Sequence, residues 1–76
     1  MDIYVEERIN VDNDLEYKPL INYRSNLIPR RGESLYFAHF GLFVVTDVIY
    51  RISDDGRTIG GNNCMWVDIR VEKVFE

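Results

Sequence analysis

The side chains with the most chemistry to offer are a single histidine, His39, and a single cysteine, Cys64. A histidine next to Phe40-Gly41 responds to pH or binds a metal only when suitable partners lie nearby. A cysteine acts as a nucleophile only beside a base or in a polarising environment. The two residues are distant in the sequence, and neither has such partners beside it. We therefore interpret His39 as a turn residue and Cys64 as a small, buried or half-buried residue at the start of a strand.

Two acidic clusters, Asp12-Asn13-Asp14 and Asp54-Asp55-Gly56, carry the oxygen ligands that calcium prefers. A calcium-binding loop also needs spaced ligands and a terminal bidentate glutamate, and neither cluster has this arrangement. Their composition is instead typical of tight turns. Because no set of catalytic groups converges, the sequence predicts that the protein is not an enzyme and uses no metal or cofactor.

Arginine and aromatic side chains offer a different chemistry, the binding of single-stranded nucleic acid, for which small barrels are often used. The residues that would supply it, together with Tyr36, are Arg30, Arg31, Arg51 and Arg57. However, 13 acidic residues against 9 basic ones give a net charge of −4, which repels a polyanion on average. Nucleic-acid binding is therefore the alternative hypothesis, and the acidic bias better suits a protein partner with a basic surface.

Trp66 gives the clearest indication of an interaction surface. Apolar and charged residues alternate after Cys64, so Met65, Val67, Ile69 and Val71 should face the core while Trp66 faces the other side. A large aromatic side chain with charged neighbours is a common composition for a protein interface. The candidate interface residues are Trp66, Arg70, Tyr36, Asp68 and Glu72. The alternative is that Trp66 is covered by the N-terminal strand or by residues 15–26.

The elements that must position these side chains follow from alternation, β-branched residues and turn signals. We expect strands at residues 3–11, 35–37, 43–52 and 65–75, and an irregular strand around residues 20–23. Glu7 interrupts the apolar face of the first strand, which favours a place at the edge of the sheet. The apolar parity changes at Thr46-Asp47, which predicts a β-bulge. Residues 53–63 are expected to form a long, mobile loop.

Length and composition indicate one small domain spanning residues 1–76. The hydrophobic fraction of 46% is typical of a globular protein, and one cysteine excludes an intrachain disulfide framework. Neither a secretory signal nor an apolar run of about 20 residues, as a membrane span requires, is visible. We therefore expect a cytoplasmic protein with no membrane partner.

These elements suggest an all-β fold, a small antiparallel, partly open SH3-like barrel of about five strands. The pattern I-P-x-x-G-E, then a strand, F-x-V-x-D-V-I-Y, a turn and V-x-I-x-V-x-K-V covers Leu27 to Val74. It resembles small uncharacterised bacterial and phage proteins with SH3-like barrels. The resemblance implies a compact, adaptor-like fold and carries over no catalytic residue.

The function that we expect is a non-enzymatic protein-interaction module, such as a small inhibitor or adaptor encoded by a phage or mobile element. A domain of this size buries only about 60–65% of the surface that its unfolded chain exposes, so its stability is small. We expect the long final strand to leave an open edge that offers backbone groups to a neighbour. The expected assembly is a homodimer or a partner docked over Trp66, Arg70 and Tyr36.

Overall fold

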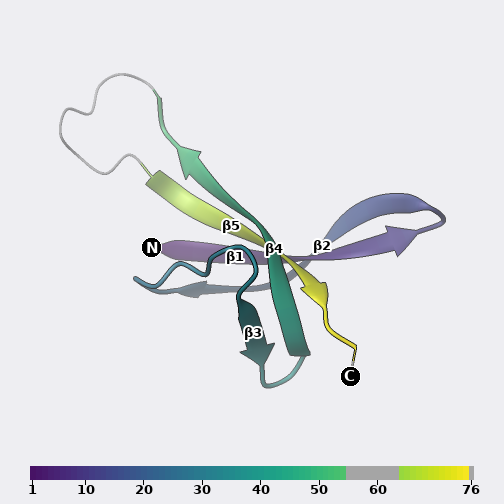
Figure 1. Cartoon of the computed structure of the whole chain (residues 1–76). Coiled ribbons are helices and arrows are strands. Elements are labelled where there is room, and N and C mark those ends of the chain that lie inside the picture. The colour runs from purple at the N-terminus through teal and green to yellow at the C-terminus, as the bar shows by residue number, and fades with distance from the viewer. Residues whose placement is uncertain (55–63, 76) are drawn as a thin grey trace.

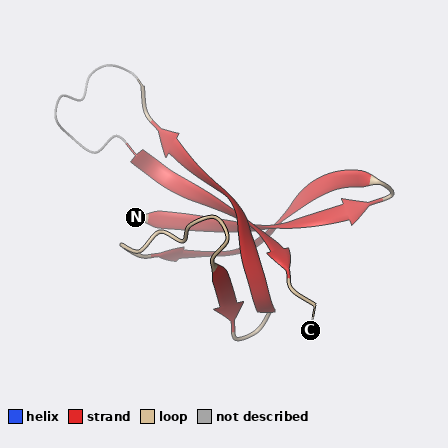
Figure 2. Ribbon diagram, in the orientation of Figure 1, coloured by secondary structure: helices blue, strands red, loops and turns tan. Residues whose placement is uncertain are grey.

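The computed structural model describes residues 1–54 and 64–75, and all regular elements in these residues are β-strands (Figures 1 and 2). The strands are β1 (Asp2–Val11), β2 (Asp14–Arg24), β3 (Ser34–Phe37), β4 (Gly41–Ile52) and β5 (Cys64–Lys73). They form one sheet in the order β2-β1-β5-β4-β3. The all-β class and the expected strands are confirmed. The irregular strand expected around residues 20–23 is longer than expected and forms β2.

The sheet is mixed and open, so the SH3-like barrel is not confirmed and the wholly antiparallel arrangement is wrong. β1 pairs with β5 in parallel, while the other neighbouring strands are antiparallel. This pairing places the β1–β2 hairpin on the side of β5 away from β4, and the strongly twisted sheet is not closed (Figure 1). Alternation along a strand indicates its buried face but not the direction of its neighbour, which explains the error.

Two expectations about the edges of the sheet are also wrong. β1 lies between β2 and β5, and β5 lies at the centre of the sheet, so the edges are β2 and β3. Glu7 is tolerated inside the sheet because it is only half-buried and faces Lys18 across the β1–β2 ladder. The true edges are poor templates for another strand, since β3 is short and β2 contains Pro19 next to a register shift at Leu20.

The core lies on one face of β1, β5 and β4. Its fully buried members are Ile3, Val5, Phe43, Val45, Val67, Ile69 and Val71. The prediction for β5 is confirmed except at Met65, which is 49% exposed because a register shift leaves it unpaired beside β4. Val48 of β4 is half-buried and packs against the core. Leu35 and Phe37 of β3 cover part of the same cluster.

The local backbone features follow the sequence closely. The predicted bulge lies at Thr46, because Val45 pairs with Val71 and Asp47 pairs with Arg70. The Thr46 hydroxyl donates to the backbone carbonyl of Arg70 at 3.2 Å. Asp12 and Asn13 have φ values of 51° and 69°, as a two-residue hairpin turn requires. Most of the loop expected at residues 53–63 lies outside the described residues.

Truncation of Ile69 tests whether this cluster is the folding core. Ile69→Ala should lower the free energy of unfolding by about 2–5 kcal/mol, because it leaves a cavity among fully buried side chains. Ile52→Ala removes the same atoms from a site that is 60% exposed and should cost less than about 1 kcal/mol. Urea titrations of both variants measure the difference, and equal losses would contradict the assignment.

Tyr23 provides a test at alkaline pH. It packs against the core, and burial raises its pKa above the ordinary value of 10.0. The folded state therefore holds this proton more tightly than the unfolded state. The resulting stability is complete below about pH 10 and is lost as the pH rises through the raised pKa. Between pH 8 and pH 11, urea denaturation should show a larger loss of unfolding free energy in the wild type than in Tyr23→Phe. Equal losses would show that Tyr23 is not involved.

Candidate interaction groove

The face of the sheet opposite the core, called the outer face here, is built by the same strands. Side chains alternate along a strand, so residues between the core positions of β1 and β5 point to the outer face. In the ladder, Tyr4 of β1 lies opposite Asp68 of β5, and Trp66 of β5 lies opposite Arg51 of β4. Residues from three strands thus meet around the first half of β5.

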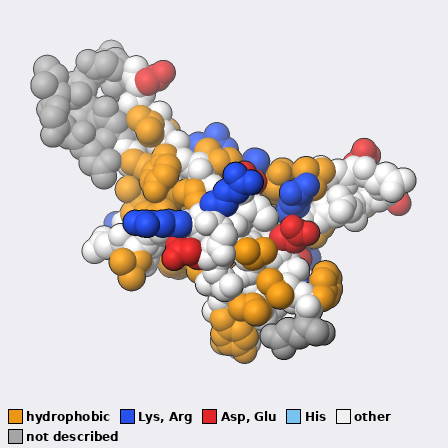
Figure 3. Space-filling view, in the orientation of Figure 1, with side chains coloured by type: hydrophobic (Ala, Val, Ile, Leu, Met, Phe, Trp, Pro, Cys, Tyr) orange, Lys and Arg blue, Asp and Glu red, His pale blue; other side chains and the backbone are white. Residues whose placement is uncertain are grey.

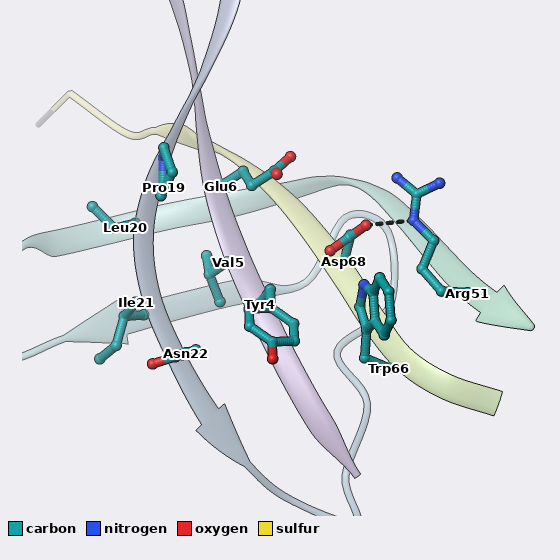
Figure 4. A pocket seen from close by; sticks show the side chains of 10 residues that line it. All are labelled: Tyr4, Val5, Glu6, Pro19, Leu20, Ile21, Asn22, Arg51, Trp66 and Asp68. Atoms are coloured by element: carbon teal, nitrogen blue, oxygen red, sulfur yellow. Dashed lines mark hydrogen bonds and ion pairs between the residues drawn. The ribbon is translucent and has the colours of Figure 1, made fainter.

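These side chains border an open groove with a volume of about 750 Å³, which is shown in Figure 4. On one side of β1 the groove is bordered by the Pro19–Asn22 segment of β2, and on the other by Arg51, Trp66 and Asp68. Its remaining lining residues are Tyr4, Val5 and Glu6 of β1. The volume is in the range of known ligand sites, about 300–1,000 Å³, although this groove is open to solvent.

Tyr4 and Trp66 form the aromatic part of the groove. Their ring centroids are 6.1 Å apart and the rings meet edge to face at 76°. Such a pair is worth about 0.5–1.5 kcal/mol beyond the area that it buries. Tyr4 nevertheless stays 41% exposed and Trp66 36% exposed. The N-terminal strand therefore covers part of Trp66, and the rest remains accessible from the groove.

Asp68 is the buried charge of the groove. Its side chain is 10% exposed, and its Oδ2 accepts a hydrogen bond from Nε of Arg51 at 2.7 Å. The Arg51 side chain is itself 46% exposed, so its guanidinium lies at the rim. Removing a carboxylate from water is costly unless it is paired, and Arg51 supplies that pairing.

A second ion pair lies on the outer face, between β5 and β1, and contacts a residue of the edge strand β2. Nε of Arg70 lies 3.4 Å from Oε2 of Glu6, its direct partner on β1. The Arg70 guanidinium also lies 3.9 Å from the ring centroid of Tyr17 on β2, in a cation–π contact. Side chains of β5, β1 and β2 are thereby connected on the face that carries the groove.

The predicted interface residues are only partly brought together. Trp66, Asp68, Arg70 and Glu72 share the outer face of β5, but only Trp66 and Asp68 line the groove. Tyr36 is 73% exposed on β3. Its partner on β4 is Leu42, which lies two residues beyond Val44, the β4 partner of Glu72. Trp66 and Glu72 are six positions apart on β5, or about 20 Å at about 3.3 Å per residue. Tyr36 therefore belongs to a different surface.

The sequence prediction missed the groove residues contributed by β1 and β2. Tyr4 and Glu6 alternate with the apolar residues of β1, so the sequence already places them on the face away from the core. Their approach to Trp66 and Asp68 depends on the parallel pairing, for which the sequence carries no local signal. The contribution of Pro19 and Asn22 depends in addition on β2 continuing through a proline.

The arginines of the nucleic-acid alternative do not form one strip in the described part of the chain. Arg30 and Arg31 border a separate depression with Val48 and Tyr50. Arg51 follows Tyr50 on β4, so its side chain points to the opposite face of the sheet. There it borders the groove and pairs with Asp68. Arg57 lies outside the described residues.

Neither of the two residues with most intrinsic chemistry lines the groove. His39 is exposed in the turn between β3 and β4, and Cys64 is half-buried, with its Sγ donating to the carbonyl of Trp66 at 3.5 Å. Among residues 1–54 and 64–75, no group of three or more His, Cys, Asp or Glu side chains could hold a metal ion.

Comparison with known proteins gives no family for this chain. No protein-family model, no curated protein and no solved structure matches it. Over the described residues, the chain has no helix of the length and hydrophobicity that crossing a membrane requires.

Loss of Arg51 tests the importance of the buried pair. Arg51→Gln should lower the free energy of unfolding by about 1–3 kcal/mol, because the Asp68 carboxylate would remain buried without its cationic partner. Arg24→Gln is the matched control. It breaks the exposed Arg24–Asp2 pair, whose side chains are 83% and 50% exposed, and should cost less than about 1 kcal/mol. Thermal and urea unfolding at neutral pH measure both, and equal costs would contradict the role given to Asp68.

Proposed function

We propose that the protein is a non-enzymatic protein-interaction module, an adaptor or inhibitor, that docks a partner in the groove between Trp66 and β2. The observation that carries this proposal is the combination of accessible aromatic surface with a partly buried ion pair in one concave site. Aromatic residues and arginine are the side chains that most often dominate protein interfaces.

The distribution of apolar side chains supports the proposal. Seven apolar residues are fully buried in the described part of the chain, whereas twelve large hydrophobic residues are substantially exposed. In the space-filling view, hydrophobic side chains gather in patches between basic and acidic ones (Figure 3). A domain with so small a core gains stability when a partner covers part of this surface.

A partner is more readily accommodated on the outer face than at an edge. β2 contains Pro19 and a register shift, and β3 has only four residues, so neither edge offers a long regular ladder. If the partner is a second copy of the chain, the proposal therefore predicts packing of faces rather than pairing of strands.

Truncation of Trp66 tests the proposed function. Trp66→Ala should abolish capture of the partner from a lysate of the source cells, because it removes the largest accessible side chain of the groove. Quantitative mass spectrometry compares the proteins retained by wild-type and variant baits, and sedimentation velocity detects self-association. Circular dichroism establishes that the variant remains folded.

Tyr36→Ala is the matched control for this experiment. It removes an aromatic side chain that is 73% exposed but lies on β3, away from the groove. It should leave partner capture unchanged. Loss of the same partner from the Tyr36 variant, but not from the Trp66 variant, would place the interface on β3 and overturn the proposal.

A further inference from the structure

Asp68 is a buried carboxylate that the described residues satisfy only in part. The residue is 7% exposed, and its Oδ2 accepts the hydrogen bond from Arg51. Within the residues that the structure describes, Oδ1 accepts no hydrogen bond. An ionised carboxylate has about four lone-pair positions, and buried polar atoms are nearly always paired. The unpaired oxygen therefore identifies a place where a hydrogen-bond donor would be stabilised.

The direction of this oxygen links it to the groove. Figure 4 shows Oδ2 of Asp68 turned toward Arg51 and the other oxygen turned toward the side of Tyr4 and Trp66. Glu6 lines the same groove with a side chain that is 30% exposed. A donor that enters beside the aromatic pair would thus meet one unpaired carboxylate oxygen and lie near a second carboxylate.

We infer that the groove receives a lysine or arginine side chain from an extended segment of the partner protein. This inference rests on the proposed function and names the chemistry of the partner. The aliphatic stem of the basic residue lies along Trp66, Tyr4 and Pro19, which supply apolar surface. Its cationic head donates to Oδ1 of Asp68 and is attracted by the aromatic faces.

Charge favours a basic side chain over a neutral donor. A charge-assisted hydrogen bond is roughly twice as strong as a neutral one. The net charge of −4 attracts a basic segment during the approach and repels an acidic one. Arg51 does not occupy the same position, because its bond to Oδ2 holds its guanidinium on the rim. In this arrangement Asp68 lies between two cations, one from each protein.

A random library of displayed dodecapeptides provides the probe. Selection on the immobilised wild-type protein should enrich peptides in which a lysine or arginine is flanked by apolar residues. Synthetic copies are then titrated into the protein and its variants by isothermal titration calorimetry, which also measures binding to Trp66→Ala, a variant that lacks the single tryptophan. Replacing the basic residue of the peptide with norleucine or citrulline should weaken binding about tenfold or more, as expected for a charge-assisted hydrogen bond.

A protein variant and its control complete the test. Asp68→Asn should also weaken the basic peptide about tenfold or more. Glu16→Gln changes the net charge equally at an exposed position on β2 outside the groove, and it should bind the peptide as the wild type does. The substitutions in the peptide leave the protein untouched, so the inference remains testable even if Asp68→Asn does not fold.

The outcomes separate this inference from the proposed function. Enriched peptides that lack a basic residue but lose binding to Trp66→Ala would overturn the inference and keep the groove as the interface. Enriched peptides that bind Trp66→Ala as tightly as the wild type, or no enrichment at all, would overturn both. Basic peptides that bind Asp68→Asn and Glu16→Gln equally would indicate non-specific attraction and would also overturn the inference.

Discussion

The parallel pairing of β1 with β5 is the constraint on which the rest of the structure depends. It joins the first strand to the last and brings Val5 beside Ile69 on the core face. The same register brings Tyr4 beside Asp68 on the outer face. A shift of one residue would exchange the two faces of β1 and remove the core and the groove together. Folding and the candidate interaction site therefore depend on one set of backbone contacts.

The charged pairs of the outer face reinforce this register. Glu6 and Arg70 are direct partners across the parallel ladder, at 3.4 Å, so a slipped β1 would separate them. The Arg51–Asp68 pair joins β4 to β5 diagonally, since the direct ladder partner of Arg51 is Trp66. Buried ion pairs contribute little net stability after desolvation, but an incorrect register would leave Asp68 buried without a partner. We interpret these pairs as determinants of a single arrangement more than as sources of stability.

The sequence predicted what depends on local pattern and missed what depends on distant pairing. The bulge at Thr46 and the buried face of Val67 and Ile69 follow from parity within one strand, and both were predicted correctly. The position of β1 inside the sheet was not predicted, because Glu7 interrupts the apolar face of this strand and no local signal reveals a parallel partner. Trp66 was identified as an interface candidate from its charged neighbours, whereas its contact with Tyr4 required the three-dimensional structure.

The proposed binding face around Trp66 depends on the parallel pairing of β1 with β5. Chemical-shift mapping of the isotopically labelled protein, with the captured partner added, distinguishes this face from the rest of the surface. If the partner binds there, the perturbed amides cluster at Tyr4, Asn22, Trp66 and Asp68, together with the indole N–H of Trp66. Perturbations confined to the β3–β4 hairpin, around Tyr36 and Phe40, would contradict it.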